Sequence, residues 1–279
     1  MHWKLRDRVL PMDARCLVMG IVNVTPDSFS DGGSYASTDA AVSQALELVR
    51  QGADILDIGG ESTRPGSQPI ALHEEMERVV PVVTALAKQT DAVLSIDTSK
   101  AAVAEACLNA GAHIINDVTG LTGDPAMAKV AREFGAGVVV MHMQGKPATM
   151  QVDPRYDDVV NDLFQYFTER LQSLTALGIA KDAIAIDPGI GFGKTREHNI
   201  SLLARLGKFT ELGRPLCLGV SRKGFLGKLL DRPVEDRLAG SLAAAAYGLA
   251  QGAVQILRVH DVAATRDLVR VWDVLTKGH

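Results

Sequence analysis

Residues 93–116, VLSIDTSKAAVAEACLNAGAHIIN, contain the unit from which the chain is built. An apolar run at residues 93–96 ends on Asp97, a helical pattern follows at 100–110, and a second short strand pattern at 113–115 ends on Asn116. Continuous apolar runs are typical of strands in a parallel sheet that is covered on both faces. The stretch therefore predicts a strand, a helix and a second parallel strand, with a polar residue where each strand ends.

The same alternation recurs along all 279 residues. It predicts strands at residues 17–22, 55–58, 93–96, 113–115, 137–141, 184–186, 215–218 and 254–257. It predicts helices at residues 38–51, 73–89, 100–110, 124–134, 156–177, 198–206, 233–250 and 263–277. Eight alternations predict an α/β fold, a (β/α)8 TIM barrel forming a single domain over residues 1–279, and a short strand pair around residues 4–10 is expected to cap the barrel bottom.

The residues on which the runs end distinguish the barrel from a doubly wound open sheet, which also fits eight alternations. In chain order they are Asn23, Asp57, Asp97, Asn116, His142, Asp187, Lys223 and the pair Arg258 and His260. An open sheet would scatter these side chains, whereas a closed barrel gathers all of them at one mouth, where barrel enzymes have their active sites. The barrel is therefore favoured, and its mouth is the candidate active site.

Composition limits the classes of partner. The chain is 47% hydrophobic and 22% charged, as in soluble globular domains, and its net charge is −4. Such a charge gives no general attraction for nucleic acid or an anionic membrane, so an anionic ligand needs a local cluster of cations. We expect small-molecule substrates and no nucleic-acid or membrane partner.

Targeting and redox features point to the cytoplasm. The three cysteines, Cys16, Cys107 and Cys217, are widely separated, which favours reduced thiols. Charged residues at positions 4, 6, 7 and 8 stand where an export signal needs an apolar segment. The uncharged stretch at 238–257 is broken by glycine and glutamine, so we interpret it as a buried helix and the last strand.

Two connections, residues 24–37 and 59–72, are longer than the fold requires. They contain TPDSFSDGG and ESTRPG, which combine carboxylates, hydroxyls, a guanidinium and glycines. Solvated turns would have a similar composition. Long connections in a compact domain are usually binding loops or lids, and these two are expected to close over a charged ligand.

Taken together, eight motifs resemble the dihydropteroate synthase family of pterin-binding barrels. In order along almost the whole chain they are NVTPDSFSDGG, DIGGESTRPG, SIDTSK, NDVTG, MHMQG, DPGIGFGK, SRKGF and RVHDV. The resemblance implies a transferase of folate biosynthesis that joins 6-hydroxymethyl-7,8-dihydropterin pyrophosphate to 4-aminobenzoate and releases pyrophosphate. It also implies Mg²⁺ as cofactor, a homodimer, and sulfonamides as competitors of aminobenzoate. We expect no fused kinase or aldolase domain, because the barrel takes up the chain.

The pterin ring presents an amino group and a ring N–H side by side, which a carboxylate complements. Asp97 and Asp187 supply carboxylates at strand ends, Asn116 both donates and accepts, and Lys223 donates only. Met141 is expected to pack on the face of the ring. The alternative for the two aspartates is a structural role as helix N-caps.

The diphosphate requires cations and a metal. The resemblance implies contacts from Thr63, Arg64, Arg258 and His260, with the Asn23 carbonyl as a hard oxygen ligand for Mg²⁺. It also implies an aminobenzoate pocket formed by Phe29, Pro65, Phe192 and Ser221. Asp57 and His142 receive no role, and His142 is expected to be structural.

The predicted reaction is a dissociative substitution at carbon. Pyrophosphate leaves, a cation conjugated with the pterin ring forms, and the amine of aminobenzoate attacks it. Asp97, Lys223, Arg64 and Asp31 are the predicted catalytic residues. The rival functions are a methyltetrahydrofolate–corrinoid methyltransferase, a phosphate-binding barrel isomerase or aldolase, and a pterin-binding paralogue without activity.

Overall fold

The computed structural model describes residues 1–25 and 33–278, with side chains described for 1–25 and 38–278. Eight parallel strands form one sheet in the order β8-β7-β6-β5-β4-β3-β10-β9. They are β3 (Leu17–Asn23), β4 (Ile55–Gly59), β5 (Val93–Asp97), β6 (Ile114–Asp117), β7 (Gly137–Met141), β8 (Ile184–Asp187), β9 (Cys217–Leu218) and β10 (Ile256–Val259). A parallel bridge between Ile186 and Leu216 joins β8 to the segment that leads into β9. The sheet is therefore closed, which confirms the barrel and excludes the open sheet.

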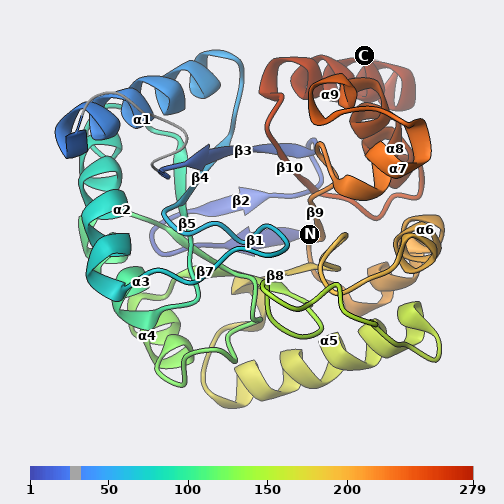
Figure 1. The fold of residues 1–279 in the computed structure, drawn as a ribbon, viewed down its shortest axis with the longest axis horizontal. Helices are drawn as coiled ribbons and strands as arrows, with labels where there is room; N and C mark the ends of the chain where they lie inside the picture. Colours follow the sequence, from blue (N-terminus) through green and yellow to red (C-terminus); the bar gives the residue numbers. More distant parts are fainter. Residues whose placement is uncertain (26–32, 279) are drawn as a thin grey trace.

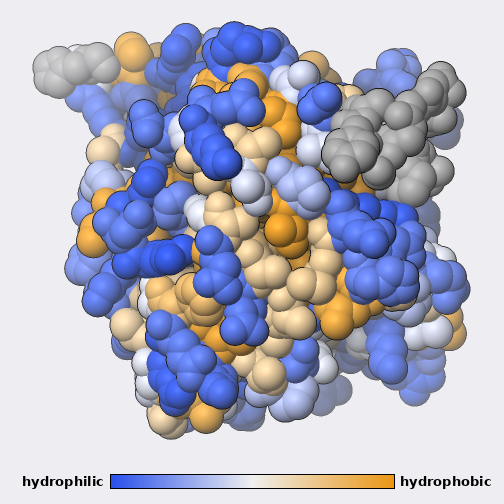
Figure 2. Space-filling model, turned by 90° about the vertical axis from the view of Figure 1, so that its left-hand side faces the viewer, coloured by the Kyte–Doolittle hydropathy of each residue, from blue (hydrophilic) through white to orange (hydrophobic). Residues whose placement is uncertain are grey.

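Helices surround the strands as an outer ring (Figure 1). They are α1 (Gly33–Arg50), α2 (Leu72–Leu86), α3 (Ala101–Ala110), α4 (Met127–Phe134), α5 (Val159–Ala176), α6 (Arg196–Ala204), α7 (Gly224–Leu230), α8 (Leu238–Ala250) and α9 (Val262–Lys277), with the 3-10 helices η2 (Lys181–Ala183), η3 (Leu206–Leu212) and η4 (Val234–Asp236). Figure 2 shows the side covered by α1, α2 and α3, where hydrophilic side chains surround a central band of moderately hydrophobic ones. Among the described helices, none is both long enough and apolar enough to cross a bilayer.

The predicted N-terminal strand pair is present and closes the barrel bottom. Strand β1 (His2–Lys4) pairs antiparallel with β2 (Val9–Pro11), and the two lie across the middle of the barrel in Figure 1. Trp3 and Leu5 are fully buried against the first inward-facing residues of the strands, such as Ile55. The Trp3 indole N–H donates to the Ala183 carbonyl at 2.8 Å, which satisfies the polar atom of this buried side chain.

The alternation of side chains along each strand places the site. In β5, Val93 packs inside the barrel while Leu94 and Ile96 pack against the surrounding helices. Side chains alternate between faces with a period of two, so Ser95 and Asp97 also face the barrel interior. The inward row thus changes from apolar at the bottom to polar at the mouth.

Three sequence predictions need correction in the last third of the barrel. The helix predicted at 233–250 begins only at Leu238, because the 3-10 helix η4 (Val234–Asp236) takes the place of its first turn and Arg237 (φ −92°, ψ 4°) separates the two helices. Helix α7 (Gly224–Leu230) was not predicted, since seven residues with two glycines give no helical period. The last strand lies at Ile256–Val259, not at 254–257, because the polar Arg258 is part of it.

Candidate active site at the barrel mouth

A cavity opens at the carboxyl ends of the strands. Its lining combines residues of both halves of the chain: Thr63, Asp97, Asn116, Val118, Met141, Asp187, Gly189, Ile190, Phe192, Gly219, Lys223 and Arg258. The proposed pterin set of Asp97, Asn116, Asp187, Lys223 and Met141 is therefore brought together completely. This agreement follows from the fold, because every inward strand end of a closed barrel faces the same opening.

A buried ion-pair cluster forms one wall of the cavity. Arg258 donates from Nε to Asp57 Oδ2 at 2.6 Å and from a terminal nitrogen to Asp97 Oδ2 at 2.7 Å. Asp57 is fully buried, and the second oxygens of Asp57 and Asp97 have no partner among the described residues. Arg258, which the sequence assigned to the diphosphate, thus lies between two carboxylates on the pterin side. The Oδ1 of Asp97 is the atom left for a ligand.

Asp57 also fixes the orientation of Asn116. The Asn116 side-chain N–H donates to Asp57 Oδ2 at 2.9 Å, and the Asn116 side chain is buried in the cavity wall. Because the amide nitrogen is committed to Asp57, the amide oxygen is left as an acceptor for a ligand. The sequence marked Asp57 as a polar strand end but gave no sign of its partners, which lie 59 and 201 residues away.

The cluster changes the acidity of Asp97. Burial raises the pKa of Asp97 to about 7, and the negative charge of Asp57 acts in the same direction, while Arg258 opposes both. A carboxyl group that titrates near neutrality changes its hydrogen-bonding character there, from donor to acceptor only. Perturbed groups of this kind are typical of functional sites.

Asp187 and Lys223 form another part of the cavity lining. Asp187 Oδ1 accepts a hydrogen bond from the Gly189 N–H at 2.7 Å, and burial raises the pKa of this carboxyl group. The Lys223 ammonium lies 4.2 Å from the centre of the Phe192 ring, within cation–π range. Burial lowers the pKa of Lys223 to about 8, although the charge of Asp187 acts in the opposite direction.

The helix N-cap interpretation of the two aspartates is wrong. Helix α3 has Lys100 at its N-cap position, with no side-chain cap, and α6 is capped by Thr195. Asp97 pairs with Arg258, and Asp187 binds Gly189 within its own loop. Their carboxylates are therefore available to the cavity.

His142 holds the loops after β7 and β8 together, as its predicted structural role requires. Its Nδ1 lies 3.1 Å from the ammonium of Lys194, which also donates to the carbonyls of His142 and Phe192 at 3.2 and 2.9 Å. The His142 ring packs edge-on against Tyr166, and burial lowers the pKa of His142 to about 3. Lys194 is only 2% exposed, and its part in this contact was not predicted.

Apart from Arg258, the residues assigned to the diphosphate lie around the rim. Thr63 lines the cavity, whereas Arg64 is exposed on the same loop. His260 is half-buried, and its Nδ1 lies 3.1 Å from Ser221 Oγ. Burial lowers the pKa of His260 to about 4, so the imidazole is neutral near pH 7 and contributes a hydrogen bond, not a charge.

The aminobenzoate set is only partly gathered. Phe192 lines the cavity, Ser221 is buried against His260, and Pro65 is exposed on the loop after β4. The N–H of Gly66 donates to the Pro147 carbonyl at 3.0 Å, which joins that loop to the loop after β7. Phe29 and Asp31, predicted for aminobenzoate binding and for catalysis, lie outside the described residues.

Asn23 is the predicted metal ligand. It ends β3, is half-buried and pairs in register with Gly59, with its side chain on the inward row. The described residues contain no group of three or more His, Cys, Asp or Glu side chains arranged to hold a metal ion. One amide oxygen suits Mg²⁺, which typically keeps several waters and takes substrate phosphate oxygens as further ligands.

Comparison with known proteins identifies the relatives of this barrel. A family model described as pterin binding enzyme matches residues 19–260. The dihydropteroate synthase of Escherichia coli (strain K12) is 49% identical over 254 residues, covering 91% of this chain and 89% of that protein. A Yersinia pestis dihydropteroate synthase, solved with a sulfonamide drug complex, has a TM-score of 0.93 and 45% identity, covering 99% of this chain and 100% of its own. A Xanthomonas albilineans dihydropteroate synthase, solved with 4-aminobenzoic acid, has a TM-score of 0.92 and 45% identity, covering 98% and 97%.

Proposed function

The chain belongs to the dihydropteroate synthases of the pterin-binding enzyme family, and from this we propose that its cavity joins 6-hydroxymethyl-7,8-dihydropterin pyrophosphate to 4-aminobenzoate. One observation carries the proposal for the site: Asp97, Asn116, Asp187 and Lys223 line the same cavity. The family and the barrel are those that the motifs predicted.

The four residues match the pterin edge in hydrogen-bonding character. The unpartnered Oδ1 of Asp97 and the carboxylate of Asp187, which lines the cavity, accept from the amino group and the ring N–H. The Asn116 oxygen, whose amide is fixed by Asp57, accepts a further hydrogen bond. Lys223 donates to the ring's acceptors, and Met141 packs on its face. The other members of the set are buried at strand ends, and Lys223 is half-buried at the N-cap of α7, so the set is preorganised for the ring before it binds.

The diphosphate lies, in this proposal, toward Thr63, Arg64 and His260, with one guanidinium nitrogen of Arg258 facing the cavity. Asn23 would hold Mg²⁺ there, and when bound the ion supplies positive charge to the leaving diphosphate. Arg64 is exposed, so its long side chain is free to reach the rim.

The reaction breaks the bond between the exocyclic carbon and the diphosphate oxygen, and the bond between that carbon and the amine nitrogen of aminobenzoate forms. Positive charge develops on the pterin in between, where the carboxylates of Asp97 and Asp187 stabilise it. Phe192, Pro65, Ser221 and Phe29 are proposed to hold the aminobenzoate ring on the open side. The amine is nucleophilic when neutral, and Asp31 is the proposed acceptor of the proton it loses.

We also propose a homodimer, working in the cytoplasm. Large apolar side chains are exposed on one side of the barrel, among them Leu229 on α7, Tyr247 on α8, and Val271 and Leu275 on α9. These three helices lie together in Figure 1, on the side away from the face in Figure 2. Exposed apolar patches mark interaction surfaces, and a second copy is the proposed occupant. The three cysteines are free and buried, which suits a reducing compartment.

The activity test supplies pterin diphosphate, 4-aminobenzoate and Mg²⁺ to the purified protein. We expect dihydropteroate and pyrophosphate to appear in equal amounts, and Asp97→Asn in a folded variant to abolish most of both. A corrinoid methyltransferase would release no pyrophosphate, and a paralogue without activity would bind the pterin but form neither product. Folded wild-type protein that forms neither product contradicts the proposal.

A further inference from the structure

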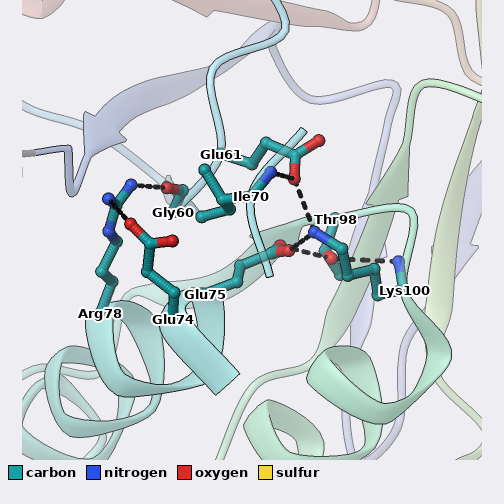
Figure 3. A network of polar contacts seen from close by, with 8 residues as sticks. All are labelled: Gly60, Glu61, Ile70, Glu74, Glu75, Arg78, Thr98 and Lys100. Atoms are coloured by element: carbon teal, nitrogen blue, oxygen red, sulfur yellow. Dashed lines mark hydrogen bonds and ion pairs between the residues drawn. The ribbon is translucent and has the colours of Figure 1, made fainter. Parts of the chain in front are cut away.

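The lysine of the SIDTSK motif lies outside the cavity, in a network of charges under the loop of residues 59–72 (Figure 3). Lys100 Nζ donates to Glu61 Oε2 and to Glu75 Oε2, both at 2.5 Å. Burial by itself lowers the pKa of Lys100, but the hydrogen bonds to Glu61 and Glu75 raise it above its ordinary value. Lys100 is therefore a cation shared by two carboxylates that come from different elements.

The two carboxylates belong to the two ends of the loop. Glu61 lies two residues after the end of β4, and its Oε2 accepts the N–H of Ile70 at 3.0 Å, which closes the loop at its base. Glu75 lies in the first turn of α2, just after the loop, and is 1% exposed. Arg78 of α2 donates to the Gly60 carbonyl at 2.8 Å, so the start of the loop is also tied to the helix.

The same network touches the strand end that carries Asp97. Thr98 Oγ1 donates to Glu75 Oε1 at 2.6 Å and accepts the N–H of Lys100 at 3.2 Å. Thr98 is the next residue after Asp97, and its N–H donates to the Asn116 carbonyl at 3.1 Å. The base of the loop is thus fixed relative to the turn that holds a proposed pterin carboxylate.

Only Ser62 separates Glu61 from Thr63, which lines the cavity beside Asp97 and Arg258. Two residues of chain span at most about 7 Å, so the position of Glu61 limits where Thr63 can lie. Without Lys100, Glu61 and the buried Glu75 would face each other as like charges, which disfavours the closed base of the loop.

We propose that Lys100 is a positioning residue: by binding Glu61 and Glu75 together, it holds the loop of residues 59–72 so that Thr63 and Arg64 meet the diphosphate of the substrate. The inference rests on the proposed function, because it concerns the diphosphate end of that substrate. Lys100 touches neither substrate and acts only through the loop.

The test compares two ligands by calorimetry in the presence of Mg²⁺ and without aminobenzoate: the pterin diphosphate, and the same pterin without the diphosphate. We expect Lys100→Met to weaken binding of the pterin diphosphate by about tenfold. A misplacement of binding groups by about 1 Å can cause a loss of up to about 100-fold, so a small shift of the loop accounts for this value. Binding of the diphosphate-free pterin should change by less than about twofold, since the pterin set lies on strand ends. Lys88→Met, which removes an exposed lysine beyond the end of α2, is the matched control.

Glu61→Gln tests the contact from the other side, because glutamine can still accept the Ile70 N–H but carries no charge for Lys100. We expect about a threefold loss for the diphosphate ligand, since Lys100 keeps Glu75 and the pair with Glu61 is partly exposed. The double variant Lys100→Met, Glu61→Gln should bind the pterin diphosphate no more weakly than Lys100→Met alone, because Glu61→Gln removes a contact that Lys100→Met has already broken.

The proposal is overturned if Lys100→Met binds the pterin diphosphate as wild type does, if it loses affinity for both ligands equally, or if the two changes add. If Lys100→Met does not fold, Glu61→Gln decides, and wild-type affinity for the diphosphate in that variant overturns the proposal. Wild-type protein that forms no dihydropteroate contradicts the proposed function, whereas an active wild type with an unaffected Lys100→Met contradicts this inference alone.

Discussion

Replacing Asp57 by asparagine tests whether the buried cluster organises the pterin pocket. The wild-type carboxylate accepts two hydrogen bonds, from Arg258 at 2.6 Å and from Asn116 at 2.9 Å, and its side chain is fully buried. Asparagine has almost the same shape, so packing is preserved and the change is electrostatic. Arg258 retains its contact with Asp97, and no buried charge is left without a partner.

The size of the effect follows from those two bonds. A hydrogen bond to a charged group contributes about 1 kcal/mol more than a neutral one, so two weakened bonds cost about 2 kcal/mol of unfolding free energy. The new side-chain N–H₂ occupies the place of Asp57 Oδ1, which has no partner among the described residues, and a buried donor without an acceptor adds about 1 to 2 kcal/mol. The expected loss is therefore about 3 to 4 kcal/mol.

Function should suffer as well, because the hydrogen bond that fixes the Asn116 amide is weakened. We expect affinity for the diphosphate-free pterin to fall by about tenfold, the equivalent of one hydrogen bond. Urea denaturation gives the stability and calorimetry gives the affinity, with Asp91→Asn, an exposed aspartate, as control. If Asp57→Asn unfolds within about 0.5 kcal/mol of wild type, a change typical of a surface site, and binds the pterin equally well, the cluster has no organising role.

Three further predictions concern pH, the loop after β8 and the metal. The pKa of Asp97 is raised to about 7, so its carboxylate forms only as the pH passes 7, and the pKa of Lys223 is lowered to about 8, so its ammonium loses its proton above pH 8. We therefore expect kcat/KM to rise through pH 7 and to fall above pH 8. A flat profile between pH 6 and 9 would contradict both roles. Lys194→Met should raise the KM for aminobenzoate more than the KM for the pterin substrate, because the Phe192 carbonyl loses the hydrogen bond from Lys194. Burial lowers the pKa of Lys194 to about 7, whereas the unfolded chain keeps this proton up to the ordinary pKa of 10.5. The free energy of unfolding of the wild type should therefore rise relative to that of the variant between pH 7 and 9 in urea titrations, and parallel curves would refute this. Chelation of Mg²⁺ by EDTA should weaken binding of the pterin diphosphate but not of the diphosphate-free pterin, and equal losses would argue against a metal at Asn23.

The barrel could be predicted because its signal is local and repeated. Each strand is a short apolar run and each polar end follows from its own sequence, so Asp97 and Asn116 were placed correctly on the inner face without knowledge of any contact. The errors fall where local patterns compete. The 3-10 helix η4 and the glycines of α7 interrupt the helical period, and the polar Arg258 makes the last strand seem to end two residues too early.

The site could be predicted only up to its long-range pairs. The inward direction of Asp187 follows from strand period, and its presence in the cavity agrees with the prediction. The position of Arg258 does not follow, because the guanidinium could turn toward the rim or toward the barrel interior. The inward position of Arg258 is fixed by its ion pairs with Asp57 and Asp97, which come from distant parts of the chain. Whether a guanidinium stays in solvent at the rim or pairs with a buried carboxylate depends on residues far away in the chain, so the local sequence does not predict it.

Three motif lysines illustrate the same limit. Lys100, Lys194 and Lys223 each follow a serine- or glycine-containing turn after a strand, and by sequence each could serve the ligand. Lys100 pairs with two carboxylates, and its pKa is raised; Lys194 meets two carbonyls and an imidazole, and its pKa falls to about 7. Only Lys223 combines a place in the cavity with an ammonium over the Phe192 ring, and among the described residues no carboxylate forms an ion pair with it. Its hydrogen-bond donors therefore remain available to a ligand, which is why we assign substrate contact to Lys223 and positioning to the other two.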